Sequence, residues 1–201
     1  MRAFIINYGV GNLHSLVSSL RRAGFETSIE KIPRSDCDLL VLPGVGSSAA
    51  ARRYLDVYGD VLRDTIKSGV MTLGICLGMQ LLFEYSLEHG YTRGLGLLDG
   101  YVDRIPTKNK LPHMGWNKVY MINRSGLCTL FEAIDKSYTY FMHSYMVYPR
   151  HFDNICLVSL YGVLIPAGMA TTNIVGVQFH PEKSGHTGLT LLNTLARWVK
   201  G

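Results

Sequence analysis

The sequence predicts an α/β fold with a central, mostly parallel sheet, helices on both faces and an antiparallel or mixed extension. In the first half, short apolar segments end in glycine loops and are followed by helical spacing, which is typical of a parallel sheet covered by helices. The second half contains short strand-like segments separated by turns. The chain then ends in an amphipathic segment.

The first half predicts alternating strands and helices. Strands are expected over residues 3–6, 38–42 and 70–75, and helices over 13–23 and 49–67. Asn12 is placed to cap the first helix at its N-terminus and Gly24 at its C-terminus. The third strand runs directly into Cys76, and in parallel sheets ligands bind at the carboxyl ends of the strands.

The second half predicts further strands and a closing helix. The strands are expected over residues 119–122, 138–142, 155–160 and 174–179, and the helix over 188–199. The sequence contains no repeat, low-complexity tract or linker that would divide it. Its 201 residues, of which 47% are hydrophobic, are therefore expected to form a single domain over residues 1–201.

Composition and charge restrict where the protein acts. No apolar run approaches the ~20 residues of a membrane helix. The formal net charge is +5, but the basic residues are scattered and are not interleaved with aromatic residues as in a nucleic-acid-binding stripe. We expect a cytoplasmic protein that binds neither membranes nor nucleic acid.

The four cysteines are widely separated, which suggests neither a disulfide framework nor a zinc site. Three of them, Cys37, Cys128 and Cys156, are interpreted as small buried core residues. No metal and no cofactor are expected. A reactive cysteine has to be recognised from its neighbours.

Cys76 has the neighbours of a nucleophile. It joins a strand to a helix with Gly74 and Gly78 two positions on either side, the layout of a nucleophile elbow with sulfur in place of oxygen. The glycines allow the sharp turn, because side chains there would collide with neighbouring strands. A position at a helix N-terminus also favours the thiolate.

A base for this nucleophile is offered by the segment His180-Pro181-Glu182, at the end of the strand expected over residues 174–179. Because proline restricts the turn, His180 and Glu182 leave the strand together and the carboxylate can orient the imidazole. The predicted triad is Cys76, His180 and Glu182.

Acyl transfer also needs donors for the developing oxyanion. The backbone amide of Leu77 and the glycine loop over residues 43–46, with Val45 and Gly46, are the candidates. An isolated glycine loop of this kind is as often a flexible turn, and its place beside the elbow is what favours the functional interpretation.

The residues that carry chemistry resemble the class I glutamine amidotransferases and, within them, the glutaminase subunits of imidazole glycerol phosphate synthase. The resemblance covers nearly the whole chain. It is carried by residues 7–12 (NYGVGN), 42–46 (LPGVG), 74–82 (GICLGMQLL), 112–117 (PHMGWN), 141–145 (FMHSY) and 176–185 (GVQFHPEKSG).

The resemblance implies that Cys76 attacks the side-chain amide of glutamine and that a glutamyl thioester forms and is hydrolysed, with His180 as acid and then base. Gln80, one helical turn after Cys76, is expected to contact the substrate. The matching segment His143, Ser144 and Tyr145 is expected to close the glutamine pocket.

The family pairs such a subunit with a (β/α)8 barrel synthase that receives the ammonia and activates the glutaminase. The resemblance implies that five residues face this partner: Asn12, His113, Met114, Trp116 and Lys183.

Two departures from the family pattern leave other readings open. Asn7 stands where Asp is frequent, and residues 161–166 are apolar where relatives are more polar and acidic. One alternative is therefore a paralogous glutaminase that supplies ammonia for the amidination of a surface sugar. Another is a noncatalytic or redox-sensing domain with an elbow cysteine, which would not need His180, Glu182 and Gln80.

Overall fold

The computed structural model describes residues 1–9, 13–44 and 48–201. The expected cap Asn12 and the loop residues Val45 and Gly46 lie outside the described residues.

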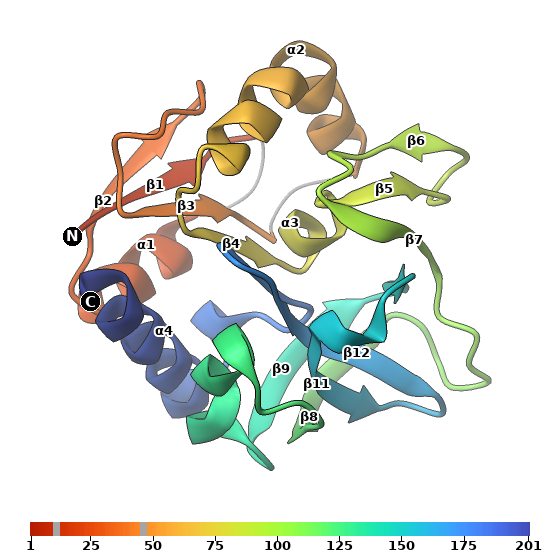
Figure 1. Cartoon of the computed structure of the whole chain (residues 1–201). Coiled ribbons are helices and arrows are strands. Elements are labelled where there is room, and N and C mark those ends of the chain that lie inside the picture. The colour runs from red at the N-terminus through yellow and green to blue at the C-terminus, as the bar shows by residue number, and fades with distance from the viewer. Residues whose placement is uncertain (10–12, 45–47) are drawn as a thin grey trace.

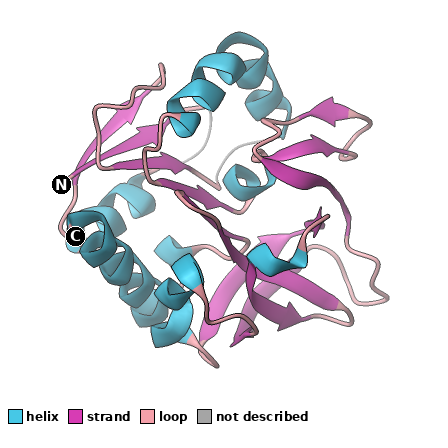
Figure 2. Ribbon diagram, viewed as in Figure 1, coloured by secondary structure: helices cyan, strands magenta, loops and turns pink. Residues whose placement is uncertain are grey.

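The fold is built on one nine-stranded sheet in the order β2-β1-β3-β4-β13-β12-β11-β8-β9 (Figures 1 and 2). Its first five strands are parallel: β2 (Glu26–Glu30), β1 (Arg2–Ile6), β3 (Leu39–Leu42), β4 (Thr72–Ile75) and β13 (Ile174–Val177). The other four continue it in antiparallel pairs: β12 (Leu164–Ala170), β11 (Ile155–Leu160), β8 (His113–Met121) and β9 (Tyr138–His143). The predicted parallel sheet with an antiparallel extension is confirmed.

Helices cover both faces of the parallel strands (Figure 1). Helix α2 (Ser48–Lys67) packs on one face, and α1 (His14–Arg22) and α4 (Gly185–Lys200) pack on the other. The 3-10 helix η1 (Gly126–Ile134) packs beside α4, and η2 (Phe152–Asn154) and η3 (Pro181–Lys183) are single turns. Gly24 follows α1 with a φ of +91°, a left-handed conformation that suits the predicted glycine cap.

A second, four-stranded sheet was not predicted. It has the order β10-β7-β5-β6, formed by β10 (Tyr145–Pro149), β7 (Leu98–Arg104), β5 (Phe83–Ser86) and β6 (Thr92–Arg93). Polar or charged residues interrupt β5, β6 and β7, which are partly exposed, so these strands lack the apolar runs by which the first sheet was recognised. The short strand β2, with charged residues at both ends, was missed for the same reason.

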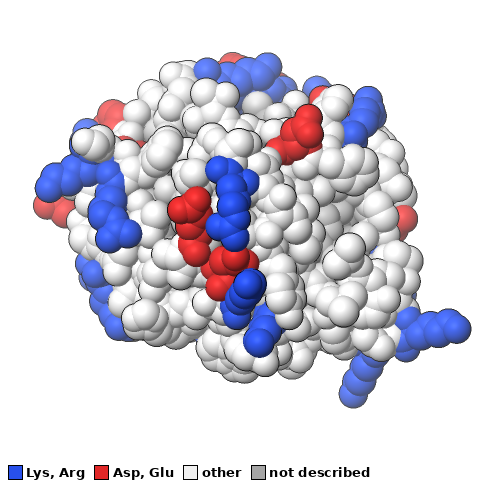
Figure 3. Space-filling view, turned by 60° about the horizontal axis from the view of Figure 1, so that its bottom comes forward, with Lys and Arg blue, Asp and Glu red and all other residues white. Residues whose placement is uncertain are grey.

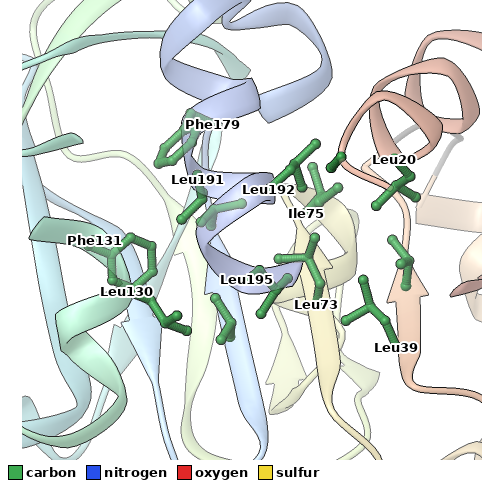
Figure 4. Packing of buried hydrophobic residues seen from close by; sticks show 14 of the residues in the cluster. Leu20, Leu39, Leu73, Ile75, Leu130, Phe131, Phe179, Leu191, Leu192 and Leu195 are labelled. Atoms are coloured by element: carbon green, nitrogen blue, oxygen red, sulfur yellow. The ribbon is translucent and has the colours of Figure 1, made fainter. Parts of the chain in front are cut away.

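Alternation along the strands creates two cores, one on each face of the sheet. In β1, Ala3 and Ile5 point toward α1 and α4, whereas Phe4 and Ile6 point toward α2. Figure 4 shows the larger core, where leucines of α4 lie between the strands and η1. These two cores fix the carboxyl ends of β3, β4 and β13 side by side.

Charged side chains are dispersed over the surface. The face in Figure 3 carries separate basic groups with acidic groups among them, and most of it is uncharged. Within the described ranges, no helix is both long enough and apolar enough to cross a membrane.

Two cysteines form a disulfide that was not expected. The interpretation of Cys128 and Cys156 as unpaired core residues is wrong, because their sulfurs are bonded and their Cα atoms are 5.2 Å apart. Both side chains are buried, as expected. The packing of η1 against β11 brings them together across 28 residues of sequence, a proximity that spacing alone cannot reveal. Cys37 and Cys76 are the free cysteines.

The disulfide predicts a stability difference. A bridge that closes a loop of this length restricts the unfolded chain and typically contributes about 3 kcal/mol. Cys128→Ala/Cys156→Ala should therefore lower the free energy of unfolding in urea by about this amount, and Cys37→Ala should change it little. A titration that finds four free thiols in the denatured, unreduced protein would contradict the pairing.

Candidate active site

Cys76 occupies a strained turn between β4 and the helix α3 (Leu77–Gln80). Its φ of 47° and ψ of −106° are unusual for a residue with a side chain. The flanking glycines make this turn possible. A Cβ on Gly78 would overlap the carbonyl of Leu42, and one on Gly74 would lie 2.9 Å from the Cα of Met79.

The helix that follows Cys76 is only one turn long. The expected stabilisation of a thiolate by the helix dipole is correspondingly weak, because the dipole grows with the number of aligned peptide units. The amide of Leu77 is the first in this turn and has no acceptor within the helix. No acceptor for it is found in the part of the chain that the structure describes, so it is a candidate donor beside the sulfur.

His180 reaches Cys76 because β13 is the parallel neighbour of β4. The amide of Cys76 donates to the carbonyl of Val177 over 2.7 Å, and His180 follows three residues later. Its Nδ1 lies 2.7 Å from Oε1 of Glu182, which sits in the turn η3. Both side chains are buried, 1% and 3% exposed, so the carboxylate holds the ring away from solvent.

The surroundings of His180 favour its charged form. Burial acts to lower the pKa, but Cys76 and Glu182 act in the opposite direction and raise it from the usual 6.5 to about 10. The ring is therefore protonated at neutral pH. Nε2 is buried and has no well-formed hydrogen bond among the described residues, so its proton is available to a bound molecule.

Gly44 closes the site from the end of β3. A Cβ at this position would lie 2.9 Å from the Cβ of Cys76, from Cε1 of His180 and from the carbonyl oxygen of Ile75. Any side chain here would separate the sulfur from the imidazole. The predicted close approach of the glycine loop holds for Gly44, whereas Val45 and Gly46 lie outside the described residues.

A cavity of about 180 Å³ opens beside Cys76. It is lined by Gly44, Ser48, Cys76, Leu77, Gln80, Glu88, Met142, His143, Ser144 and Tyr145. All the residues predicted to contact a substrate are among them. Ser48 and Glu88 were not predicted, and since Glu88 follows Cys76 by twelve residues through an unpredicted strand, no local pattern pointed to it.

Gln178 is a further residue that the sequence reasoning missed. It is fully buried, and its Nε2 lies 3.4 Å from the sulfur of Cys76. Its Oε1 accepts a hydrogen bond of 3.1 Å from Nε2 of Gln80. Strand alternation could have indicated it, because a residue two positions before His180 lies on the same side of the backbone.

His113 does not face a partner, and that prediction is wrong for its side chain. The ring is 2% exposed and stacks between Phe141 and Tyr161. The alternation of β8 explains this: its neighbours Met114 and Trp116 point outward, so His113 points inward. Its Nδ1 instead lies 3.2 Å from Nε2 of His143, below the cavity.

The other predicted partner-facing residues in the described part of the chain are exposed. Met114 and Trp116 are 58% and 55% exposed on β8, and Lys183 is exposed on η3. Lys183 lies over the ring of Tyr140, a neighbour of Trp116 across the strands. Asn12 is outside the described residues.

A cysteine at a strained turn, an imidazole held by a carboxylate and a cavity beside the sulfur define a class of enzymes that transfer acyl groups through a thiolate. The family model for Glutamine amidotransferase class-I matches residues 4–195.

Full-length relatives narrow the class. The chain is 46% identical to the imidazole glycerol phosphate synthase subunit HisH of Saccharolobus solfataricus, with 100% of both chains covered. It is 41% identical to the HisH subunit of Aquifex aeolicus, covering 98% of this chain and 97% of that one. The chain thus belongs to the class-I glutamine amidotransferases, a family of enzymes, and within it to the HisH subunits.

A solved structure agrees with the fold. The structure of PurLQS from Thermotoga maritima has a chain that superposes with a TM-score of 0.77 over 98% of both chains. At 20% identity this likeness bears on the fold alone.

The buried histidine pair predicts sensitivity to acid. Burial lowers the pKa of His113 to about 4 and that of His143 to about 3. The unfolded chain therefore binds these protons first, and the free energy of unfolding falls as the pH drops from about 6.5 toward 4. His113→Phe removes one of these groups. The free energy of unfolding of this variant should therefore fall less than that of the wild type as the pH drops over that range.

Urea unfolding at several pH values measures this difference, with His186→Phe as a control in which the same substitution removes an exposed imidazole. If plots of the free energy of unfolding against pH stay parallel for His113→Phe and the wild type between pH 6.5 and 4.5, the predicted linkage is contradicted.

Proposed function

We propose that this chain hydrolyses glutamine at Cys76 and passes the ammonia to a (β/α)8 barrel synthase subunit that makes imidazole glycerol phosphate and AICAR in histidine biosynthesis. The observation that carries the proposal is the sequence of contacts from Glu182 to His180 to Cys76, whose side chain lines the cavity. The names of the full-length relatives support the histidine pathway over amidination of a surface sugar.

The positions of the three side chains support the following reaction. The thiolate of Cys76 attacks the amide carbon of glutamine, and the proton on Nε2 of His180 goes to the departing ammonia. The product is a glutamyl thioester. His180, now neutral, takes a proton from water, which attacks the thioester and releases glutamate and the thiolate. Glu182 keeps Nδ1 protonated and the ring oriented through both steps.

The cavity offers groups for the amino-acid end of the substrate. Nε2 of Gln80 donates to Tyr145 and to Gln178, so its Oε1 is the group left to accept from an α-ammonium. The carboxylate of Glu88 lines the same cavity and suits that charge. His143, Ser144 and Tyr145 also line the cavity.

The amide of Leu77 is proposed as one oxyanion donor, with a second donor from Val45 or Gly46. We further propose that binding of the synthase and its substrate completes this second donor. An isolated chain would then be nearly inactive although its triad is assembled.

An exposed apolar surface suits the synthase. Outward-facing residues of β8 and β9 form the β8–β9 outer face: Met114, Trp116, Tyr138, Tyr140 and Met142. Met114 pairs with Met142 and Trp116 with Tyr140 across the strands. Aromatic residues and methionine are enriched at protein interfaces, and Met142 also lines the cavity, so this face joins the reactive site to the proposed partner.

The first test measures glutamate and ammonia release from glutamine. We expect activity when the chain is mixed with a histidine-pathway barrel synthase and its substrate, and little with either omitted. Cys76→Ala should abolish the activity, because no other thiol reaches the cavity in the described structure, and Cys37→Ala should retain it. Activity that persists in Cys76→Ala would remove the mechanism. Activation only by a surface-sugar barrel subunit would favour the paralogue.

The second test concerns the β8–β9 outer face. Trp116→Ala should weaken synthase binding about 30-fold, as expected for an aromatic residue at the centre of an interface. Trp198→Ala, on α4, is a matched control because that side chain is also exposed, at 49%. Binding measured by calorimetry should be unchanged in the control. Equal affinities for the two variants would place the interface elsewhere.

A further inference from the structure

Among the described residues, the sulfur of Cys76 has two polar neighbours besides His180. One is the carbonyl of Met142, 3.9 Å away, which can only accept and therefore favours the protonated thiol. The other is Nε2 of Gln178 at 3.4 Å, which can only donate and therefore favours the thiolate. Since the helix after Cys76 has a single turn, the Gln178 donor stands out as a fixed dipole that favours the charged sulfur.

The direction of the Gln178 amide is set by a backbone carbonyl. The carbonyl of Tyr145 lies 3.1 Å from the side-chain amide of Gln80 and 2.8 Å from Nδ1 of His143. Because a carbonyl cannot donate, Gln80 must present its NH₂ group, and the second hydrogen of that group faces Gln178. Gln178 must then present its oxygen to Gln80, which turns its own NH₂ group toward Cys76.

The same carbonyl fixes the histidines on the other side. His143 must carry its proton on Nδ1 to donate to Tyr145, so its Nε2 accepts from Nδ1 of His113. His113 in turn presents Nε2 to the amide of Asn117 at 3.5 Å. Neither ring can turn without breaking a buried hydrogen bond. The Tyr145 carbonyl is thereby held in place to receive Gln80.

We propose that Gln178 is a positioning residue for the nucleophile: its Nε2–H, aimed by Gln80 and the Tyr145 carbonyl, holds the sulfur of Cys76 as a thiolate that faces the cavity. The proposal rests on the proposed function only in taking Cys76 as the nucleophile. His180 supplies the positive charge beside the thiolate. Gln178 adds a neutral donor, which stays in place when His180 gives up its proton.

Five other charged or titratable groups of the described residues surround the sulfur and its cavity. His180 and Glu182 approach from the end of β13 and from η3, and His143, Tyr145 and Glu88 line the cavity. All five remain in Gln178→Met, which adds no charge, so a change measured in that variant reports the lost donor.

The test is the pH dependence of Cys76 alkylation by iodoacetamide in a Cys37→Ser background, where Cys76 is the remaining free thiol. Gln178→Met removes the donor at similar size, and Gln178→Glu replaces it with an acceptor. We expect the midpoint of the rate–pH profile to rise by about one pH unit in both variants, since a hydrogen bond to a charged group has about that strength.

Ser159→Ala is the matched control. Ser159 is fully buried and donates a hydrogen bond to the carbonyl of Lys118, as Gln178 does to the sulfur, but it lies on β11 away from the cavity. The alkylation midpoint of Ser159→Ala should equal that of the Cys37→Ser parent protein. A loss of packing alone would lower the thermal midpoints of the Gln178 variants without moving the alkylation midpoint.

An unmoved alkylation midpoint in folded Gln178→Met and Gln178→Glu overturns the proposal. If neither variant folds, Gln80→Met tests the same arrangement, because it frees the Gln178 amide to turn, and its midpoint must also rise. Alkylation needs neither glutamine nor a synthase. A shifted midpoint in a chain that shows no glutaminase activity even with a barrel synthase and its substrate present would therefore refute the proposed function and leave the role of Gln178 standing.

Discussion

The site depends on one constraint, the sharp turn at Cys76. The turn exists because Gly74 and Gly78 have no side chains, which allows the backbone of α3 to press against β4 and against the carbonyl of Leu42 in β3. The strained φ of Cys76 is maintained by this packing, which is buried on all sides. Without it the sulfur would not stand at the carboxyl end of the sheet.

The parallel strands convert this turn into a reactive centre. β3, β4 and β13 are neighbours, so Gly44, Cys76 and His180, each at the end of its strand, converge although they are far apart in sequence. The two cores on opposite faces fix these strand ends, and Glu182 then fixes the imidazole over 2.7 Å. Rigid strands thus supply the geometry, and a buried ion pair supplies the protonated ring.

The hydrogen bonds around the cavity have fixed donors and acceptors because one member of the network, a backbone carbonyl, can only accept. The Tyr145 carbonyl orients Gln80 and His143, and through them Gln178 and His113. Burial makes an unpaired donor or acceptor costly, which is why these amides and rings keep one orientation. The low pKa values of the two histidines follow from the same burial.

The sequence by itself determined the fold class and which residues could react. Strand, glycine and helix periodicities are local signals, and the glycines around Cys76 and the proline between His180 and Glu182 restrict the backbone wherever they occur. Local signals also placed most strands of the first sheet and the helices that cover it, and the family resemblance placed residues 143–145 in the cavity wall, whereas Ser48 and Glu88 were not predicted.

Only the tertiary structure decided the contacts between distant segments. It paired Cys128 with Cys156, turned His113 inward, shortened the helix after Cys76 to one turn and brought Gln178 to the sulfur. Each of these depends on how one strand or helix packs against another, and the free energy of that packing belongs to pairs of segments. No single stretch of the sequence contains it.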